Sequence, residues 1–245
     1  MFEERVQDYS FQIDPSDPNN ARTKFIRMIP RGSRVLEVGC ANGSLAGYLT
    51  QHLGCEVVGI ELNPEAAREA EFHCSHIIVG DVERGALDRA EGIFDVITFG
   101  DVLEHLVLPG AVLSRCRSLL SDEGFLLLSI PNVAHYMLRF RLLLGQFDYE
   151  QYGLLDRTHL RFFTLRTARQ MLAESGYRIS EFDIVYAVHG GRIIRRCGPL
   201  ERFLKRHLTG LIGNQFIFKA TKTAGTNGGL GESVACPDTR QWVNP

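Results

Sequence analysis

The chain has 245 residues, of which 44% are hydrophobic, and a formal net charge of −2 at pH 7. This length suffices for one α/β core, and the small net charge excludes a general electrostatic attraction to nucleic acid. No apolar run reaches the roughly 20 residues that span a bilayer, and the charged residues 1–10 do not resemble a signal peptide. We therefore expect a cytoplasmic protein that does not act on nucleic acid.

Cysteine and histidine residues give no sign of a structural metal centre. The six cysteines lie apart without a Cys-x-x-Cys pair, so neither a disulfide framework nor a zinc site is expected. His73, Cys74 and His76 are better explained as a polar helix end beside a partly buried thiol. We expect no metal site from these residues, and the sequence leaves open whether any reaction depends on a metal ion.

Helical and strand-like patterns alternate along the first half of the chain. Helices are expected at 20–29, at 44–53, from Asn63-Pro64 onward and at 109–120. Strands are expected at 34–38, 56–61, 77–79, 94–99 and 124–130. β-Branched strands that alternate with helices indicate a doubly wound parallel sheet, in which ligands bind beyond the carboxyl ends of the strands.

The order of elements changes after residue 132. A helix at 133–144 and a segment rich in aromatic and polar residues form an insertion at about 133–164, where we place acceptor recognition. A helix at 165–175 and strands at 177–188 and 214–221 follow. We expect residues 1–33 to form an N-terminal helical cap, 34–222 the main domain and 223–245 a flexible tail.

The turn after the first strand indicates an adenosine-bearing ligand. Glycines allow a tight turn beneath such a ligand, and an acid at the end of the next strand can accept hydrogen bonds from both ribose hydroxyls. A dinucleotide fingerprint needs glycines at its first, third and sixth positions, where this chain has Gly39, Ala41 and Ser44. A nicotinamide oxidoreductase is therefore the weaker alternative.

Two stretches carry a family resemblance. Glu37-x-Gly39-x-x-x-Gly43, closed by Glu61, resembles the first two motifs of class I S-adenosylmethionine-dependent methyltransferases. Residues 100–106, Gly-Asp-Val-Leu-Glu-His-Leu, resemble the fourth motif of ubiquinone-biosynthesis-type O-methyltransferases. Residues 155–164 resemble a subgroup of bacterial methyltransferases associated with cell-surface glycans and secondary metabolites.

The resemblance implies a fold and a cofactor. The fold is α/β and Rossmann-like, with a seven-stranded, mostly parallel sheet, an antiparallel last strand and helices on both faces. The cofactor is S-adenosylmethionine, which leaves as S-adenosylhomocysteine. The implied cofactor-binding residues are Glu37, Gly39, Cys40, Ala41, Gly43, Glu61, Leu62, Asp81, Val82, Gly100, Asp101 and His105.

Several of these positions have a second interpretation. The family commonly has glycine where Ala41 stands, and we expect the alanine to take an ordinary negative φ. Asp81 would accept from the adenine amino group, or it caps a helix. Glu104 as an acid that stabilises a helix dipole, and His105 as a packed histidine, are explained as well by structure as by a role in the site.

The expected reaction is in-line O-methylation of a small molecule or of a glycan or secondary-metabolite intermediate. His135 is the first candidate for the general base and His159 the second, with Asp156 orienting a histidine. N- or C-methylation of a natural product, or a catalytically silent cofactor-binding domain, are the alternatives. Residues 192–212 read as a cover helix with a solvated basic face, or as a weak contact with anionic membrane lipid.

Overall fold

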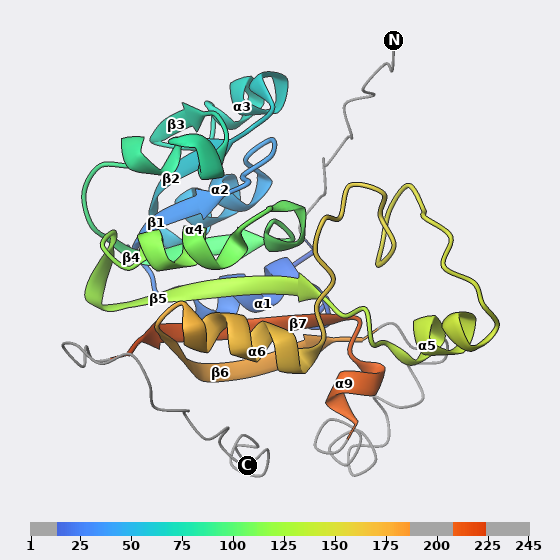
Figure 1. The fold of residues 1–245 in the computed structure, drawn as a ribbon. Coiled ribbons are helices and arrows are strands. Elements are labelled where there is room, and N and C mark those ends of the chain that lie inside the picture. Colours follow the sequence, from blue (N-terminus) through green and yellow to red (C-terminus); the bar gives the residue numbers. More distant parts are fainter. Residues whose placement is uncertain (1–13, 187–207, 224–245) are drawn as a thin grey trace. The chain divides into compact units, whose positions relative to one another are not determined.

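The computed structural model describes residues 14–186 and 208–223 (Figure 1). It divides into two compact units, the first formed by Met1–Gly100 and Arg115–Gly124 and the second by Asp101–Ser114 and Phe125–Pro245. Most of the expected basic helix at 192–212 and nearly all of the expected tail lie outside the described residues. The predicted division into cap, domain and tail stays a prediction.

Seven strands form one mixed sheet in the order β3-β2-β1-β4-β5-β7-β6. In the first unit, β1 pairs in parallel with β2 and β4, and β2 pairs in parallel with β3. In the second unit, β7 runs antiparallel to both β5 and β6. The predicted fold class, with an antiparallel last strand, is confirmed.

The first unit contains the strands that the sequence predicts most sharply. Its strands are β1 (Arg34–Val38), β2 (Glu56–Glu61), β3 (His76–Val79) and β4 (Phe94–Gly100). Its helices are α1 (Ala21–Met28), α2 (Ser44–Tyr48), the π-helical turn η1 (Leu49–Leu53), α3 (Pro64–Ala70) and the 3₁₀ turns η2 (Val82–Arg84) and η3 (Leu87–Arg89). The side chains of Asn20 and Asn63 cap α1 and α3 by accepting from backbone amides.

The π-helical turn η1 is a departure from the predicted continuous helix at 44–53. The helix keeps its predicted extent but widens in its second half, and Gly54 ends it in the left-handed conformation with φ 67°. Leu36, Ile60 and Phe94 are fully buried, so the core of this unit lies around its strands.

Two elements extend across the boundary in the sequence between the units. Helix α4 covers Pro109–Cys116 and strand β5 covers Leu120–Pro131, so the helix is shorter and the strand longer than predicted. The prediction placed the start of the strand at Gly124 because residues 121–123 are polar. These residues nevertheless belong to the strand, where they are half-buried or exposed.

The second unit contains the turn η4 (Leu103–His105), α5 (Tyr136–Leu143), α6 (Leu165–Glu174), β6 (Tyr177–Val185), α9 (Thr209–Ile212) and β7 (Gln215–Lys222). Helix α5 begins three residues later than predicted, because the Asn132 side chain accepts from the Ala134 amide and donates to two carbonyls near α9. Phe216 and Phe218 are fully buried on β7. In the described ranges, no helix is both long and apolar enough to cross a bilayer.

Candidate active site

The turn between β1 and α2 takes the left-handed conformation at three alternate residues. Gly39, Ala41 and Gly43 have φ values of 72°, 49° and 76°. The expectation that Ala41 has a negative φ is wrong. An alanine in this region costs roughly 1–2 kcal/mol, because its Cβ crowds the following carbonyl oxygen. The turn therefore holds Ala41 in a conformation that favours glycine, which is the residue common at this position in the resembling family.

Glu61, at the end of β2, ties this turn to the following one. Its Oε2 accepts from the Ala41 amide at 2.8 Å, and its Oε1 accepts from the Asn63 amide at 2.8 Å. Because each carboxylate oxygen accepts more than one hydrogen bond, Glu61 keeps acceptor capacity for a ligand's hydroxyls. The bond to Ala41 also compensates for the strained backbone there.

Glu37 is buried beneath the turn. Burial raises the pKa of its carboxyl to about 8, against a smaller opposing effect of the Arg22 charge. Its Oε2 has no hydrogen-bond partner among the described residues. A buried acceptor without a partner costs free energy, so this oxygen suits a ligand's amino group or a bridging water. Contact of Glu37 and Glu61 with the amino-acid and ribose ends of S-adenosylmethionine stays a prediction.

Gly43 combines the left-handed conformation with close packing, and this predicts a large effect of one methyl group. A Cβ there would lie 2.9 Å from the Ala70 Cα atom, whereas a Cβ on Gly32, with a similar φ of 72°, would meet nothing within 4 Å. We expect Gly43→Ala to lower the free energy of unfolding by about 2–4 kcal/mol and Gly32→Ala by about 1 kcal/mol. Urea denaturation measures both. Equal losses would show that packing under the turn does not matter.

The other predicted cofactor residues of the first unit differ in exposure. Cys40 is buried, and the adjacent Cys74 side chain, followed by burial, raises the pKa of its thiol. Leu62 is 67% exposed, which suits a surface that a ligand covers. Gly100 is also exposed, at the end of β4.

Asp81 caps the turn η2. Its Oδ1 accepts from the Glu83 amide at 2.8 Å, and its Oδ2 lies 3.5 Å from Nε of Arg84. Val82, the next residue, is buried. The capping role named as the alternative is present, and contact with adenine stays a prediction.

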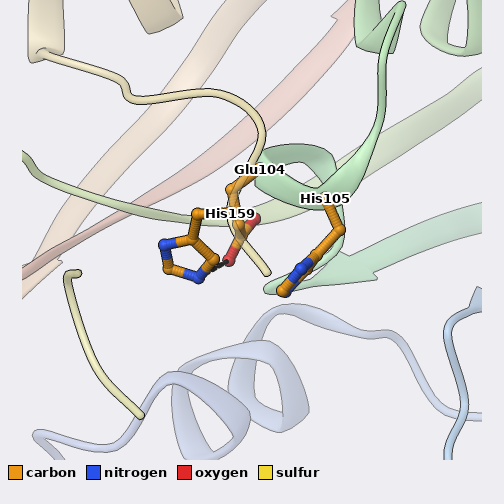
Figure 2. A group of neighbouring side chains, drawn as sticks. All are labelled: Glu104, His105 and His159. Atoms are coloured by element: carbon orange, nitrogen blue, oxygen red, sulfur yellow. Dashed lines mark ion pairs between the residues drawn. The ribbon is translucent and has the colours of Figure 1, made fainter. Parts of the chain in front are cut away.

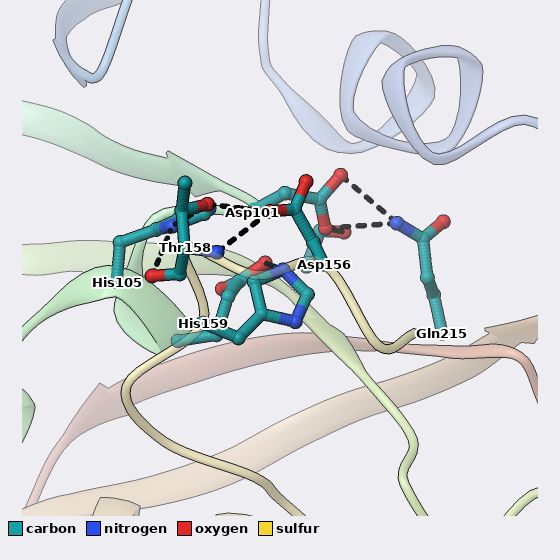
Figure 3. A network of polar contacts seen from close by, with 8 residues as sticks. Asp101, His105, Asp156, Thr158, His159 and Gln215 are labelled. Carbon is teal, nitrogen blue, oxygen red and sulfur yellow. Dashed lines mark hydrogen bonds and ion pairs between the residues drawn. The ribbon is translucent and has the colours of Figure 1, made fainter. Parts of the chain in front are cut away.

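In the second unit, Asp101 is held by residues distant in the sequence. Its φ is 57°, and its carboxylate accepts from the Ser129 hydroxyl at 2.6 Å and from the Gln215 amide at 2.8 and 2.9 Å. Ser129 lies on β5. Gln215, labelled in Figure 3, lies on β7. Neither partner was open to prediction from the sequence, because neither belongs to a local motif.

Glu104 and His159 form a buried contact (Figure 2). Glu104 is 1% exposed, and both of its carboxyl oxygens lack a hydrogen-bond partner among the described residues. His159 Nε2 lies 3.9 Å from Glu104 Oε1. Burial, with a smaller contribution from Asp101, raises the pKa of Glu104 well above its ordinary value, and burial lowers that of His159. Both shifts favour the uncharged forms, because burial removes each group from water.

His105 completes this group, and its ring meets that of His159 edge to face at a centroid distance of 4.9 Å. One nitrogen from each histidine and one Glu104 oxygen lie within 4.8 Å of one another. Side chains of these types at this spacing are able to hold a divalent cation. The absence of a metal site stays a prediction, and this group is the place to test it.

Asp156 holds Thr158, and its role in orienting a histidine stays a prediction (Figure 3). Its Oδ1 accepts from the Thr158 amide at 2.8 Å and from the Thr158 hydroxyl at 2.7 Å. Thr158 in turn contacts Nδ1 of His105 through its hydroxyl and its carbonyl. The Asp-x-Thr spacing is typical of an Asx turn, so Thr158 was open to prediction from the sequence.

His135, the first candidate for the base, is 3% exposed and precedes α5. Its Nε2 is buried without a hydrogen-bond partner among the described residues, and burial lowers the pKa of its imidazole. A neutral imidazole can accept a proton. At this depth, however, an acceptor would reach the ring only if the surrounding residues moved. Its role as a base stays a prediction.

A sequence model of the methyltransferase domain family matches residues 15–181, more than half of the chain. The chain belongs to this methyltransferase family. The resemblance to class I S-adenosylmethionine-dependent methyltransferases is thereby confirmed.

Curated relatives of this methyltransferase domain match one part of the chain. The ubiquinone biosynthesis O-methyltransferase of Xanthomonas axonopodis pv. citri is 37% identical over 122 residues, 46% of this chain and 50% of the relative. The enzyme of the same name from Neisseria meningitidis serogroup C is 31% identical over 127 residues, 45% of this chain and 53% of the relative. The chain thus spans about half the length of the curated relatives it matches.

Solved methyltransferases share the fold at lower identity. Magnesium protoporphyrin IX methyltransferase of Synechocystis PCC 6803, crystallised with S-adenosylhomocysteine, is 16% identical with a TM-score of 0.58, over 84% of this chain and 83% of that one. A SAM-dependent methyltransferase of Archaeoglobus fulgidus is 18% identical with a TM-score of 0.58, over 82% and 92%. At these identities the likeness bears on the fold alone.

Proposed function

We propose that this protein transfers a methyl group from S-adenosylmethionine to an oxygen atom of a small molecule. The observation that carries the proposal is the Glu61 carboxylate, which is fixed by the Ala41 and Asn63 amides and keeps acceptor capacity for ribose hydroxyls. The unpartnered Oε2 of Glu37 supports it, because the donor carries an amino group that this oxygen would receive. Curated relatives named as O-methyltransferases favour oxygen over nitrogen or carbon.

The bound donor supplies an electrophilic methyl carbon on a sulfonium. As the acceptor hydroxyl gives its proton to a base, its oxygen bonds to the methyl carbon, and the electrons of the broken carbon–sulfur bond stay on sulfur. The protein's contribution is to align the reactants, exclude water and receive the proton. In the second unit the histidines at 105, 135 and 159 are the candidate proton acceptors.

Calorimetry on the full chain tests the cofactor. We expect S-adenosylhomocysteine to bind and NAD not to bind. Binding of NAD alone would overturn the proposal, and the nicotinamide oxidoreductase would replace it.

An acceptor screen with methyl-labelled donor then tests the chemistry. The panel should hold phenols, sugar hydroxyls, amines and activated carbon acids, since glycan, N- and C-methylation are the alternatives to be separated. Label in an ether or ester product supports the proposal, whereas label confined to amines or carbon acids contradicts O-methylation. Donor binding without transfer to any compound that the natural host contains would indicate a catalytically silent domain.

A further inference from the structure

The ring of His105 is held through one nitrogen. Its Nδ1 lies 3.2 Å from the carbonyl oxygen of Thr158 and 3.1 Å from the hydroxyl of the same residue (Figure 3). A carbonyl oxygen only accepts hydrogen bonds, so the hydrogen of this pair is on Nδ1. In the neutral ring, Nε2 is then the nitrogen with the unshared electron pair.

The Thr158 hydroxyl agrees with this assignment. It donates its single hydrogen to Oδ1 of Asp156 at 2.7 Å, and the same oxygen accepts from the Thr158 amide at 2.8 Å. With its hydrogen engaged, the hydroxyl acts toward His105 as an acceptor. Asp156 is buried, so the turn that carries both acceptors is fixed from within the second unit.

His105 differs in its contacts from the two histidines that the sequence ranked first. His135 is buried, and the His159 side chain is 6% exposed and faces Glu104. His105 is half-buried, and its Nε2 has no hydrogen-bond partner among the described residues. It therefore combines a fixed tautomer with a second ring nitrogen that carries no hydrogen bond among the described residues.

We propose that His105 contacts the methyl acceptor through Nε2, which accepts the hydrogen bond of the reacting hydroxyl, and that Thr158 and Asp156 are positioning residues that hold the ring in this tautomer. The inference rests on the proposed methyl transfer. It replaces His135 and His159 by His105 as the group in contact with the acceptor. It also assigns Thr158 a role that follows only from its contacts in the folded chain.

The tautomer can be tested without knowing the acceptor. Nitrogen-15 spectra of the histidine side chains in the full chain, above the pH range in which histidines are charged, report which ring nitrogen carries the hydrogen. The His105 signals are those lost in His105→Gln. We expect the hydrogen on Nδ1, and a hydrogen on Nε2 would overturn the assignment even if methyl transfer itself is demonstrated.

The positioning role is tested by a matched pair of variants. Thr158→Val keeps the side-chain shape and removes the hydroxyl, whereas Thr158→Ser keeps the hydroxyl. With an acceptor from the screen, we expect Thr158→Val to lower kcat about tenfold, the effect of one lost hydrogen bond, without changing donor affinity. Thr158→Ser should restore most of kcat.

Asp156→Asn provides a second route to the same question. Its amide oxygen can still accept both hydrogen bonds from Thr158, though without the negative charge, so we expect a smaller loss of kcat than in Thr158→Val. Thermal unfolding checks that each variant remains folded. Wild-type kcat in a folded Thr158→Val would overturn the positioning role, and an equal loss in Thr158→Ser would show that the hydroxyl is not what matters.

Discussion

Glu61→Ala is expected to weaken binding of S-adenosylhomocysteine by about 100-fold or more. The change removes the acceptor for the ribose hydroxyls, and two hydrogen bonds to a charged group contribute roughly 3 kcal/mol together. It also leaves the Ala41 and Asn63 amides without the partner that each has at 2.8 Å. The turn at Ala41, already strained, then has less to hold it in place.

Calorimetric titration with S-adenosylhomocysteine measures this loss. Glu56→Ala is the matched control, because Glu56 begins the same strand and its side chain is 54% exposed in an ion pair with Arg34. Exposed pairs contribute little, so donor affinity should not change in the control. Glu61→Gln should also bind weakly, since its amide nitrogen would face a backbone donor. Wild-type affinity in Glu61→Ala would remove the central support for the proposed function.

Glu37→Gln is expected to make the unliganded protein more stable at neutral and alkaline pH. The pKa of Glu37 is about 8 in the folded chain, against an ordinary value of 4.5. Between these pH values the folded state holds a proton that the unfolded state has released, so stability falls as pH rises. The difference corresponds to about 5 kcal/mol once the pH exceeds the folded value, at 1.36 kcal/mol per pKa unit.

Urea denaturation at several pH values checks this prediction. The wild-type free energy of unfolding should fall between pH 5 and 8 relative to that of Glu37→Gln, and the two should converge near pH 4.5. Other groups contribute their own slopes: the raised pKa of Glu104 acts in the same direction, and the lowered pKa of His159 weakens folding at acid pH. Both remain in the variant, so the difference isolates Glu37. Parallel curves would mean that Glu37 is ionised in the folded chain.

The local parts of the fold were open to prediction from the sequence. Strands β1 and β2 match their predicted limits, because apolar β-formers there are bounded by a turn on either side. Asn63 caps its helix through a bond to the amide two residues away. Where neighbours in the sequence determine the local structure, residue type and spacing are enough to predict it.

The rest depends on contacts that the order of residues does not reveal. The backbone conformation of Ala41 follows from its bond to Glu61, 20 positions later, and not from the preference of alanine. His135 resembles a base in the sequence, but folding buries it. Asp156 was predicted to orient a histidine, but its carboxylate binds Thr158, and only the folded chain brings Thr158 against His105.

The bonds between Gln215 and Asp101 have a consequence for synthesis of the chain. The two residues are 114 positions apart, whereas the bond between Ala41 and Glu61, in the turn after β1, spans only 20 positions. At ribosomal rates of about 5–20 residues per second, roughly 6–23 s pass between the emergence of Asp101 and that of Gln215. A nascent or prematurely ended chain therefore contains both partners of the Ala41–Glu61 bond while the Asp101 carboxylate still lacks its hydrogen-bond donor Gln215 on β7. The order of translation thus separates formation of the turn at residues 39–43 from completion of the second unit.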